Sequence, residues 1–169
     1  MKDIFAIIQE NKALLRTRET LLDILKPVVK DISVQIGGSY ALKFWCEAFS
    51  DREISDYDFI VKTSIVDAHR VIDFLDKLCK LGCISKPYTY YDYPSYYMGY
   101  VYGKRVNIIV VGTESPFTSS SYYESTENVI DVKKSWVRRE QAAGRIPREK
   151  DLRDIETYEK WYNENNLPF

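Results

Sequence analysis

The first third of the chain contains the stretch Ile32-Ser33-Val34-Gln35-Ile36-Gly37-Gly38-Ser39. Apolar and polar residues alternate from 32 to 36, which predicts a strand with one buried face. The glycines Gly37 and Gly38 then bring bare backbone N–H groups to the start of the next helix, an arrangement suited to binding a phosphate. Ser39 is a favoured N-cap residue, and its hydroxyl could reach a phosphate oxygen. The same glycines, taken alone, also suit an ordinary strand-to-helix turn.

A second motif, Asp56-Tyr57-Asp58, opens the next predicted strand, 57–61. Residues i and i+2 of a strand project to the same face, so Asp56 and Asp58 direct two carboxylates toward one small volume. Two like charges held close are costly unless a cation lies between them. Mg²⁺ (or Mn²⁺) suits this position, because it takes a few carboxylates and bridges to nucleotide phosphates. An isolated Asp-x-Asp is also common in surface loops.

The remaining periodicity predicts alternating elements along the whole chain. After one or two helices in the first thirty residues, we expect strands at 32–36, 57–61, 88–92, 96–102 and 105–111, and helices at 40–49, 64–81, 126–143 and 148–163. This order predicts an α/β (α+β) fold, with a mixed β-sheet, an N-terminal helix and a C-terminal helical tail. We expect a single domain, 1–169, with its core at about 30–112 and its helical C-terminal part at about 126–169.

Local signals refine three of the predicted helices. Ser64, with Asp67 three residues later, resembles a capping arrangement, and Gly144 marks the end of the helix that starts at Thr126. In the helix 40–49, helical spacing predicts one shared apolar face. That face consists of Ala41, Phe44, Trp45, Ala48 and Phe49.

The two motifs together resemble the nucleotidyltransferase superfamily of polymerase-beta type. The likeness is strongest to its small bacterial and phage members that read Gly-Gly-Ser-x-Ala-Leu, a group that includes relatives of abortive-infection toxins. It covers about residues 30–62 and is carried by Gly37-Gly38-Ser39-Tyr40-Ala41-Leu42, Arg52 and Asp56-Tyr57-Asp58-Phe59-Ile60-Val61. Arg145, Lys150-Asp151 and Asp154-Ile155 also look like the helical tail of such proteins.

This resemblance implies how the site residues act. Gly37, Gly38 and Ser39 would bind the triphosphate of a nucleotide, and Asp56 and Asp58 would bind Mg²⁺ or Mn²⁺. The family implies a third carboxylate on a later strand whose end lies beside the Asp pair. Here that position is Asn107, whose amide oxygen can coordinate a metal but carries no charge and is a poor base. Glu114 could substitute from the following loop.

Composition limits the choice of partners. The formal net charge is −1, but residues 133–153 hold eight basic residues against three acidic ones, a stripe that attracts phosphates or forms a solvated helix face. No apolar run approaches the ~20 residues that span a bilayer, and no signal peptide is apparent, so we expect a cytoplasmic protein without a membrane partner. Three cysteines and one histidine argue against a disulfide framework or a closed zinc site.

Two function classes follow. One is a Mg²⁺-dependent nucleotidyltransferase that moves NMP from an NTP to a hydroxyl of RNA (tRNA suits the basic segment 133–153), protein or a small molecule. The other is a degenerate nucleotidyltransferase fold that would bind a nucleotide, RNA or protein as a regulator or inhibitor, a role that suits a phage or mobile-element protein. Eight of the fourteen tyrosines lie between Tyr88 and Tyr102; they fit β-strands, a stacking platform or an interface.

Overall fold

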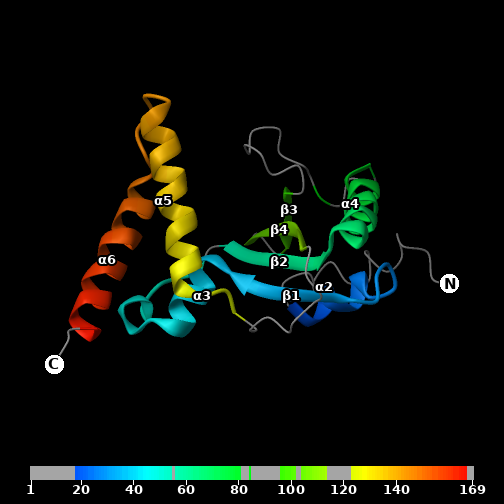
Figure 1. The fold of residues 1–169 in the computed structure, drawn as a ribbon, viewed down its shortest axis with the longest axis horizontal. Coiled ribbons are helices and arrows are strands. Elements are labelled where there is room, and N and C mark those ends of the chain that lie inside the picture. Colours follow the sequence, from blue (N-terminus) through cyan, green and yellow to red (C-terminus); the bar gives the residue numbers. More distant parts are fainter. Residues whose placement is uncertain are drawn as a thin grey trace. The chain divides into compact units, whose positions relative to one another are not determined.

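The computed structural model describes residues 18–54, 56–80, 84, 96–101, 104–113 and 123–166. These residues form two compact units (Figure 1). The first comprises the chain up to Gly37 and from Ile54 to Tyr123, and the second comprises residues 38–53 and the chain from Glu124 onward. Residues 38–53 therefore group with the C-terminal helices, and the backbone passes from the first unit to the second between Gly37 and Gly38.

The first unit contains a four-stranded mixed sheet in the order β1-β2-β4-β3. The strands are β1 (Ile32–Gly37), β2 (Asp56–Ser64), β3 (Tyr96–Val101) and β4 (Lys104–Thr113). β2 and β4 are parallel, whereas β1 is antiparallel to β2 and β3 is antiparallel to β4. The predicted α/β class and mixed sheet are thus confirmed.

Helices α2 (Arg18–Leu25) and α4 (Ile65–Lys80) contribute to one hydrophobic core with the sheet. The sheet residues of this core alternate along the strands with residues of the opposite face, as a strand with one buried face requires. The Ser64 hydroxyl accepts a hydrogen bond of 3.1 Å from the Asp67 N–H, so the predicted cap of α4 is confirmed. The core residues of the sheet are Val34, Phe59, Val61, Tyr97, Val106, Ile108 and Val110.

Tyr97 is the largest fully buried side chain among the described residues. Its hydroxyl donates to the Asp76 carboxylate on α4 at 2.8 Å and lies 3.3 Å from the Ile72 carbonyl. Burial, together with the Asp76 carboxylate, raises the pKa of the Tyr97 phenol far above its usual value. This tyrosine of the predicted cluster therefore ties β3 to α4 instead of offering a stacking surface.

The second unit is helical. It contains α3 (Gly38–Trp45), the 3₁₀ turn η1 (Glu47–Phe49), α5 (Thr126–Ala142) and α6 (Glu149–Asn165). The Ser125 hydroxyl caps α5 by accepting from the Asn128 N–H at 3.2 Å, and Gly144 follows its last turn with φ at +72°. α5 and α6 then run side by side as a helical hairpin, with α3 beside α5 (Figure 1). The predicted stop at Gly144 is confirmed.

The predicted apolar face of the helix 40–49 is wrong. α3 ends at Trp45, and Cys46 adopts an extended conformation before η1, so residues on the two sides of Cys46 do not share one helical face. Phe44 and Trp45 are 55% and 48% exposed. Their rings contact each other edge to face, with centroids 4.9 Å apart. The buried residues are instead Ala41, Leu42, Cys46 and Phe49.

Several predicted elements lie outside the described residues. These are any helix in residues 1–17 and the strand at 88–92. The remaining predicted strands and helices are present, with ends that differ by a few residues, as expected for boundaries inferred from sequence.

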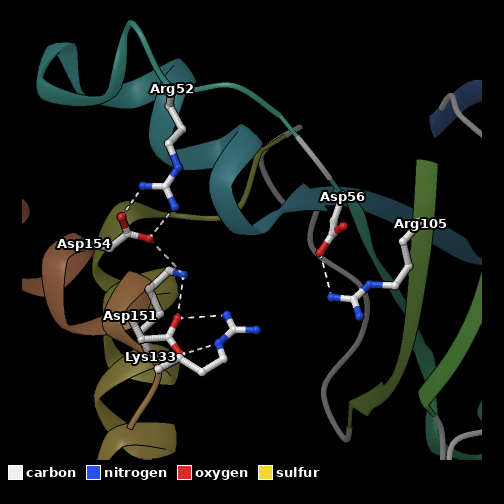
Figure 2. Close-up of polar contacts among 7 residues, drawn as sticks. Arg52, Asp56, Arg105, Lys133, Asp151 and Asp154 are labelled. Carbon is white, nitrogen blue, oxygen red and sulfur yellow. Dashed lines mark hydrogen bonds and ion pairs between the residues drawn. The ribbon is translucent and has the colours of Figure 1, made fainter. Parts of the chain in front are cut away.

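A network of charged side chains joins the helices of the second unit (Figure 2). The Asp154 carboxylate on α6 accepts two hydrogen bonds from Arg52 and lies 3.1 Å from Lys133 Nζ on α5. Lys133 Nζ also lies 3.2 Å from Asp151, which in turn accepts two hydrogen bonds from Arg148. Burial alone would raise the pKa of Asp151, but its cationic neighbours outweigh that effect and lower it.

The neighbouring residues Lys133 and Lys134 provide a matched test of this network. Lys133→Ala removes a cation shared by two buried carboxylates, and we expect a loss of about 3 kcal/mol in the free energy of unfolding. Lys134→Ala removes an ion pair to Glu159 between more exposed side chains, and we expect less than about 1 kcal/mol. Urea unfolding followed by circular dichroism measures both values, and equal losses would contradict a structural role for the network.

Candidate functional site

The predicted site residues of the first unit lie in one row across the sheet. Gly37 at the end of β1 pairs with Asp58 on β2, and Asp58 pairs with Asn107 on β4. Two residues before Asp58 on β2, and on the same face of the sheet, Asp56 pairs with Arg105. The strand assignment that placed Asn107 beside the Asp pair is therefore confirmed.

Asp56 forms an ion pair with Arg105, a residue that our sequence analysis did not select. The Arg105 guanidinium donates to the Asp56 carboxylate at 2.7 Å (Figure 2). The side chains are 27% and 30% exposed, so water and small ions reach both partners. Arg105 and Asn107 are two residues apart on β4, as Asp56 and Asp58 are on β2. Knowledge of the strand register would therefore have identified Arg105 as the neighbour of Asp56.

Asp58 accepts a hydrogen bond from Asn107. The Asn107 amide nitrogen donates to the Asp58 carboxylate at 2.7 Å, and Asn107 is only 4% exposed. A carboxylate at position 107 would place a second negative charge against Asp58, whereas the amide supplies a donor. Asn107 therefore gives Asp58 a hydrogen-bond donor and adds no negative charge to the site.

In the second unit, the glycine of the phosphate motif already has an anionic partner. Gly38 has φ at +62°, a left-handed value that side chains disfavour, so the turn requires glycine here. Its N–H donates to the carboxylate of buried Glu124 at 3.3 Å. Glu124 precedes the α5 cap and is 86 positions from Gly38, so no local sequence signal pointed to it. A phosphate bound by the Gly38 N–H would have to replace this carboxylate.

The prediction that Ser39 caps the helix is wrong. α3 begins at Gly38, which places Ser39 inside the first turn instead of before it. The cause is the positive φ of Gly38, which completes the change of chain direction one residue earlier than Ser39 would.

The basic segment 133–153 is less available to a partner than its composition indicates. Lys133, Lys134, Arg145 and Arg148 form ion pairs with carboxylates of the same unit. Arg139 lies over the Trp136 ring, with its guanidinium carbon 5.7 Å from the ring centroid. Arg138 is exposed on the same helix. Of the other basic residues of α5, Lys133 is buried, and Lys134 and Arg139 are half-buried.

The first unit offers some, but not all, of the oxygen ligands that one hard divalent cation requires. Asp56 and Asp58 offer carboxylate oxygens on one face, and Mg²⁺ binds through one or two carboxylates plus water and substrate phosphates. Within the described ranges, no group of three or more His, Cys, Asp or Glu side chains gathers as a metal cage. A metal ion held here would thus take its further ligands from water and, with a nucleotide bound, from phosphate oxygens. Glu114, the proposed substitute ligand, lies outside the described residues.

Comparisons with known proteins add no family to this geometry. No family model, curated protein or solved structure matches the chain. In the part of the chain that the structure describes, no helix combines the length and apolar character needed to cross a membrane.

The substitution Asn107→Asp tests whether this face accepts a divalent cation. The new carboxylate would lie against Asp58 in a buried position, so we expect a lower melting temperature in the presence of EDTA. Mn²⁺ or Mg²⁺ should restore stability, because a cation would then lie among three carboxylates. Differential scanning fluorimetry with and without metal measures this effect. Asn107→Leu, which adds no charge, serves as the control, and equal metal responses of the two variants would contradict a cation site.

Proposed function

We propose that this chain binds a nucleoside triphosphate with Mg²⁺ and transfers its nucleotidyl group to a hydroxyl acceptor. The observation that carries the proposal is the row Gly37–Asp58–Asn107, with Asp56 beside it on the same strand. Through this pairing, Gly37, the first glycine of the motif, lies directly opposite one of the two carboxylates. Such proximity supports a site in which a triphosphate and its metal ion meet.

The proposed reaction is a displacement at phosphorus. The acceptor hydroxyl oxygen attacks the α-phosphorus of the nucleotide, the bond from that phosphorus to the bridging oxygen breaks, and pyrophosphate leaves. The hydroxyl proton passes to a carboxylate or to water. Asp58 is the candidate base, because it contributes the carboxylate of the row, whereas its neighbour Asn107 is an amide and no base. A bound Mg²⁺ would neutralise the charge that develops on the phosphate oxygens.

The remaining residues would position the nucleotide. The backbone at Gly37, continued by Gly38 and Ser39, would bind phosphate oxygens, and Asp56 and Asp58 would hold the metal. The neutral Asn107 gives the site less negative charge than three carboxylates would. Transfer would use two metal ions, one on the triphosphate and one that activates the acceptor hydroxyl. The second ion would be held less tightly, because the site lacks a third carboxylate, and we therefore expect nucleotide binding with slow transfer.

The test combines binding and transfer. Calorimetry with ATP, GTP, CTP and UTP, each with and without Mg²⁺, should detect metal-dependent binding and identify the preferred base. Incubation with the labelled nucleotide, Mg²⁺ or Mn²⁺ and cell extract should then transfer label to an acceptor. Asp58→Asn should reduce transfer at least about 100-fold, the typical contribution of a general base.

A pair of glycine variants separates the phosphate motif from folding. Gly38→Ala and Gly144→Ala both introduce a side chain at positive φ and so share a similar conformational cost. Only Gly38→Ala should weaken nucleotide binding. Failure of all four nucleotides to bind, or label transfer that persists in Asp58→Asn, would overturn the proposal.

A second candidate is a binding module without chemistry. It is favoured by Asn107, which replaces the third carboxylate, and by the ion pair that already occupies Asp56. In this case a nucleic acid or acidic protein would contact the exposed basic residues of α5. The two candidates differ in which residues their activity requires.

Charge reversal distinguishes the two candidates. For the binding module, Arg138→Glu combined with Arg139→Glu should abolish RNA binding in a filter or fluorescence anisotropy assay, because the double change replaces two neighbouring positive charges of α5 with negative ones that repel phosphates. Asp56→Ala combined with Asp58→Ala should leave that binding intact. Loss of binding in the Asp variants and not in the Arg variants would instead support the nucleotidyltransferase.

A further inference from the structure

The ion pair between Asp56 and Arg105 places a guanidinium where the proposed function requires a metal ion. A divalent cation shared by Asp56 and Asp58 needs the Asp56 oxygens that Arg105 now contacts at 2.7 Å. The cation and the guanidinium therefore compete for the same carboxylate. Because both side chains are more than a quarter exposed, the pair is weak enough to exchange.

Displacement would leave the Arg105 side chain on the same face of the sheet. Its strand position is fixed by the pairing of β4 with β2, and its long side chain keeps the charge close to the site after the contact breaks. A bound divalent ion with a freed guanidinium makes this face net positive. A planar guanidinium binds two phosphate oxygens at once, so a polyphosphate is the matching ligand.

We propose that Arg105 is a phosphate-binding residue of this site, held by Asp56 until a divalent cation takes its place. The inference rests on the proposed nucleotide site and names a residue that the Gly-Gly-Ser and Asp-x-Asp motifs do not include. Metal and phosphate then bind cooperatively: the metal frees Arg105, and Arg105 contacts the phosphates. Without metal, Asp56 and the phosphates compete for the same guanidinium, so binding of polyphosphate alone is weak.

The test uses two probes that do not depend on the base or on the acceptor. The first is Mn²⁺ without nucleotide, titrated by electron paramagnetic resonance, and the second is tripolyphosphate with Mg²⁺, titrated by calorimetry. The variants are Arg105→Gln, Arg105→Lys and Lys62→Gln. Lys62 follows Asp58 on β2 with the same alternation, so its substitution removes an equal charge at the far end of the strand.

The inference predicts effects of opposite sign. Arg105→Gln should bind Mn²⁺ about two- to fivefold more tightly, because Asp56 loses its competing cation. It should bind Mg²⁺-tripolyphosphate at least about tenfold more weakly, because a charge-assisted contact is lost. Arg105→Lys keeps the charge without the planar fork and should fall between Arg105→Gln and the unsubstituted protein. Lys62→Gln should change either affinity less than about twofold.

Three results would count against the inference in distinguishable ways. Unchanged tripolyphosphate binding in Arg105→Gln, with normal binding by the unsubstituted protein, would overturn the role of Arg105 alone. A parallel loss of Mn²⁺ and tripolyphosphate affinity would show that Arg105 only supports the fold, and melting curves of both Arg105 variants would reveal that cause. Failure of the unsubstituted protein to bind either probe would overturn the proposed function and this inference together.

Discussion

The parallel pairing of β2 with β4 is the interaction on which both faces of the sheet depend. Side chains alternate along a strand, so the register of β2 and β4 places Phe59, Val61 and Ile108 in the core. On the other face of the sheet, Asp56 lies beside Arg105 and Asp58 lies beside Asn107. A slip of one residue would carry the carboxylates into the core, at a cost of several kcal/mol for each buried charge. Burial of the apolar face thus holds the polar residues in place, and a site built there inherits the rigidity of the core.

The charged contacts of the molecule fall into two kinds. In the second unit, Lys133 is shared by Asp151 and Asp154, and both carboxylates are buried, so breaking these contacts would leave charge in a poorly solvated place. In the first unit, Asp56 and Arg105 are partly exposed, and water can replace either partner. The first kind supports structure, and the second kind suits exchange with a ligand. In addition, the Gly38 backbone N–H donates a hydrogen bond to the Glu124 carboxylate.

Asn107 determines which chemistry the first unit favours. Its amide donates to Asp58 in a position that is almost fully buried, and a third carboxylate there would need a cation to be stable. The chain therefore folds with this face satisfied internally, by Arg105 on one carboxylate and by Asn107 on the other. In the proposed nucleotide site, a metal ion would therefore have to displace Arg105 from Asp56, and the site would activate an acceptor less than three carboxylates would.

Local patterns in the sequence were enough to predict the mixed α/β class, most strands and helices, the Ser64 cap and the stop at Gly144, because alternation, capping and glycine conformations act over a few residues. The position of Asn107 beside the Asp pair was implied by the family resemblance and not by these local patterns. The same patterns missed Arg105 and Glu124, and they assigned Phe44 and Trp45 to one helical face with Ala48 and Phe49. Those features depend on strand register, on a contact between residues 86 positions apart, and on the point at which α3 ends. Such contacts form between segments distant in sequence, so they arise only when the strands pair and the helices pack.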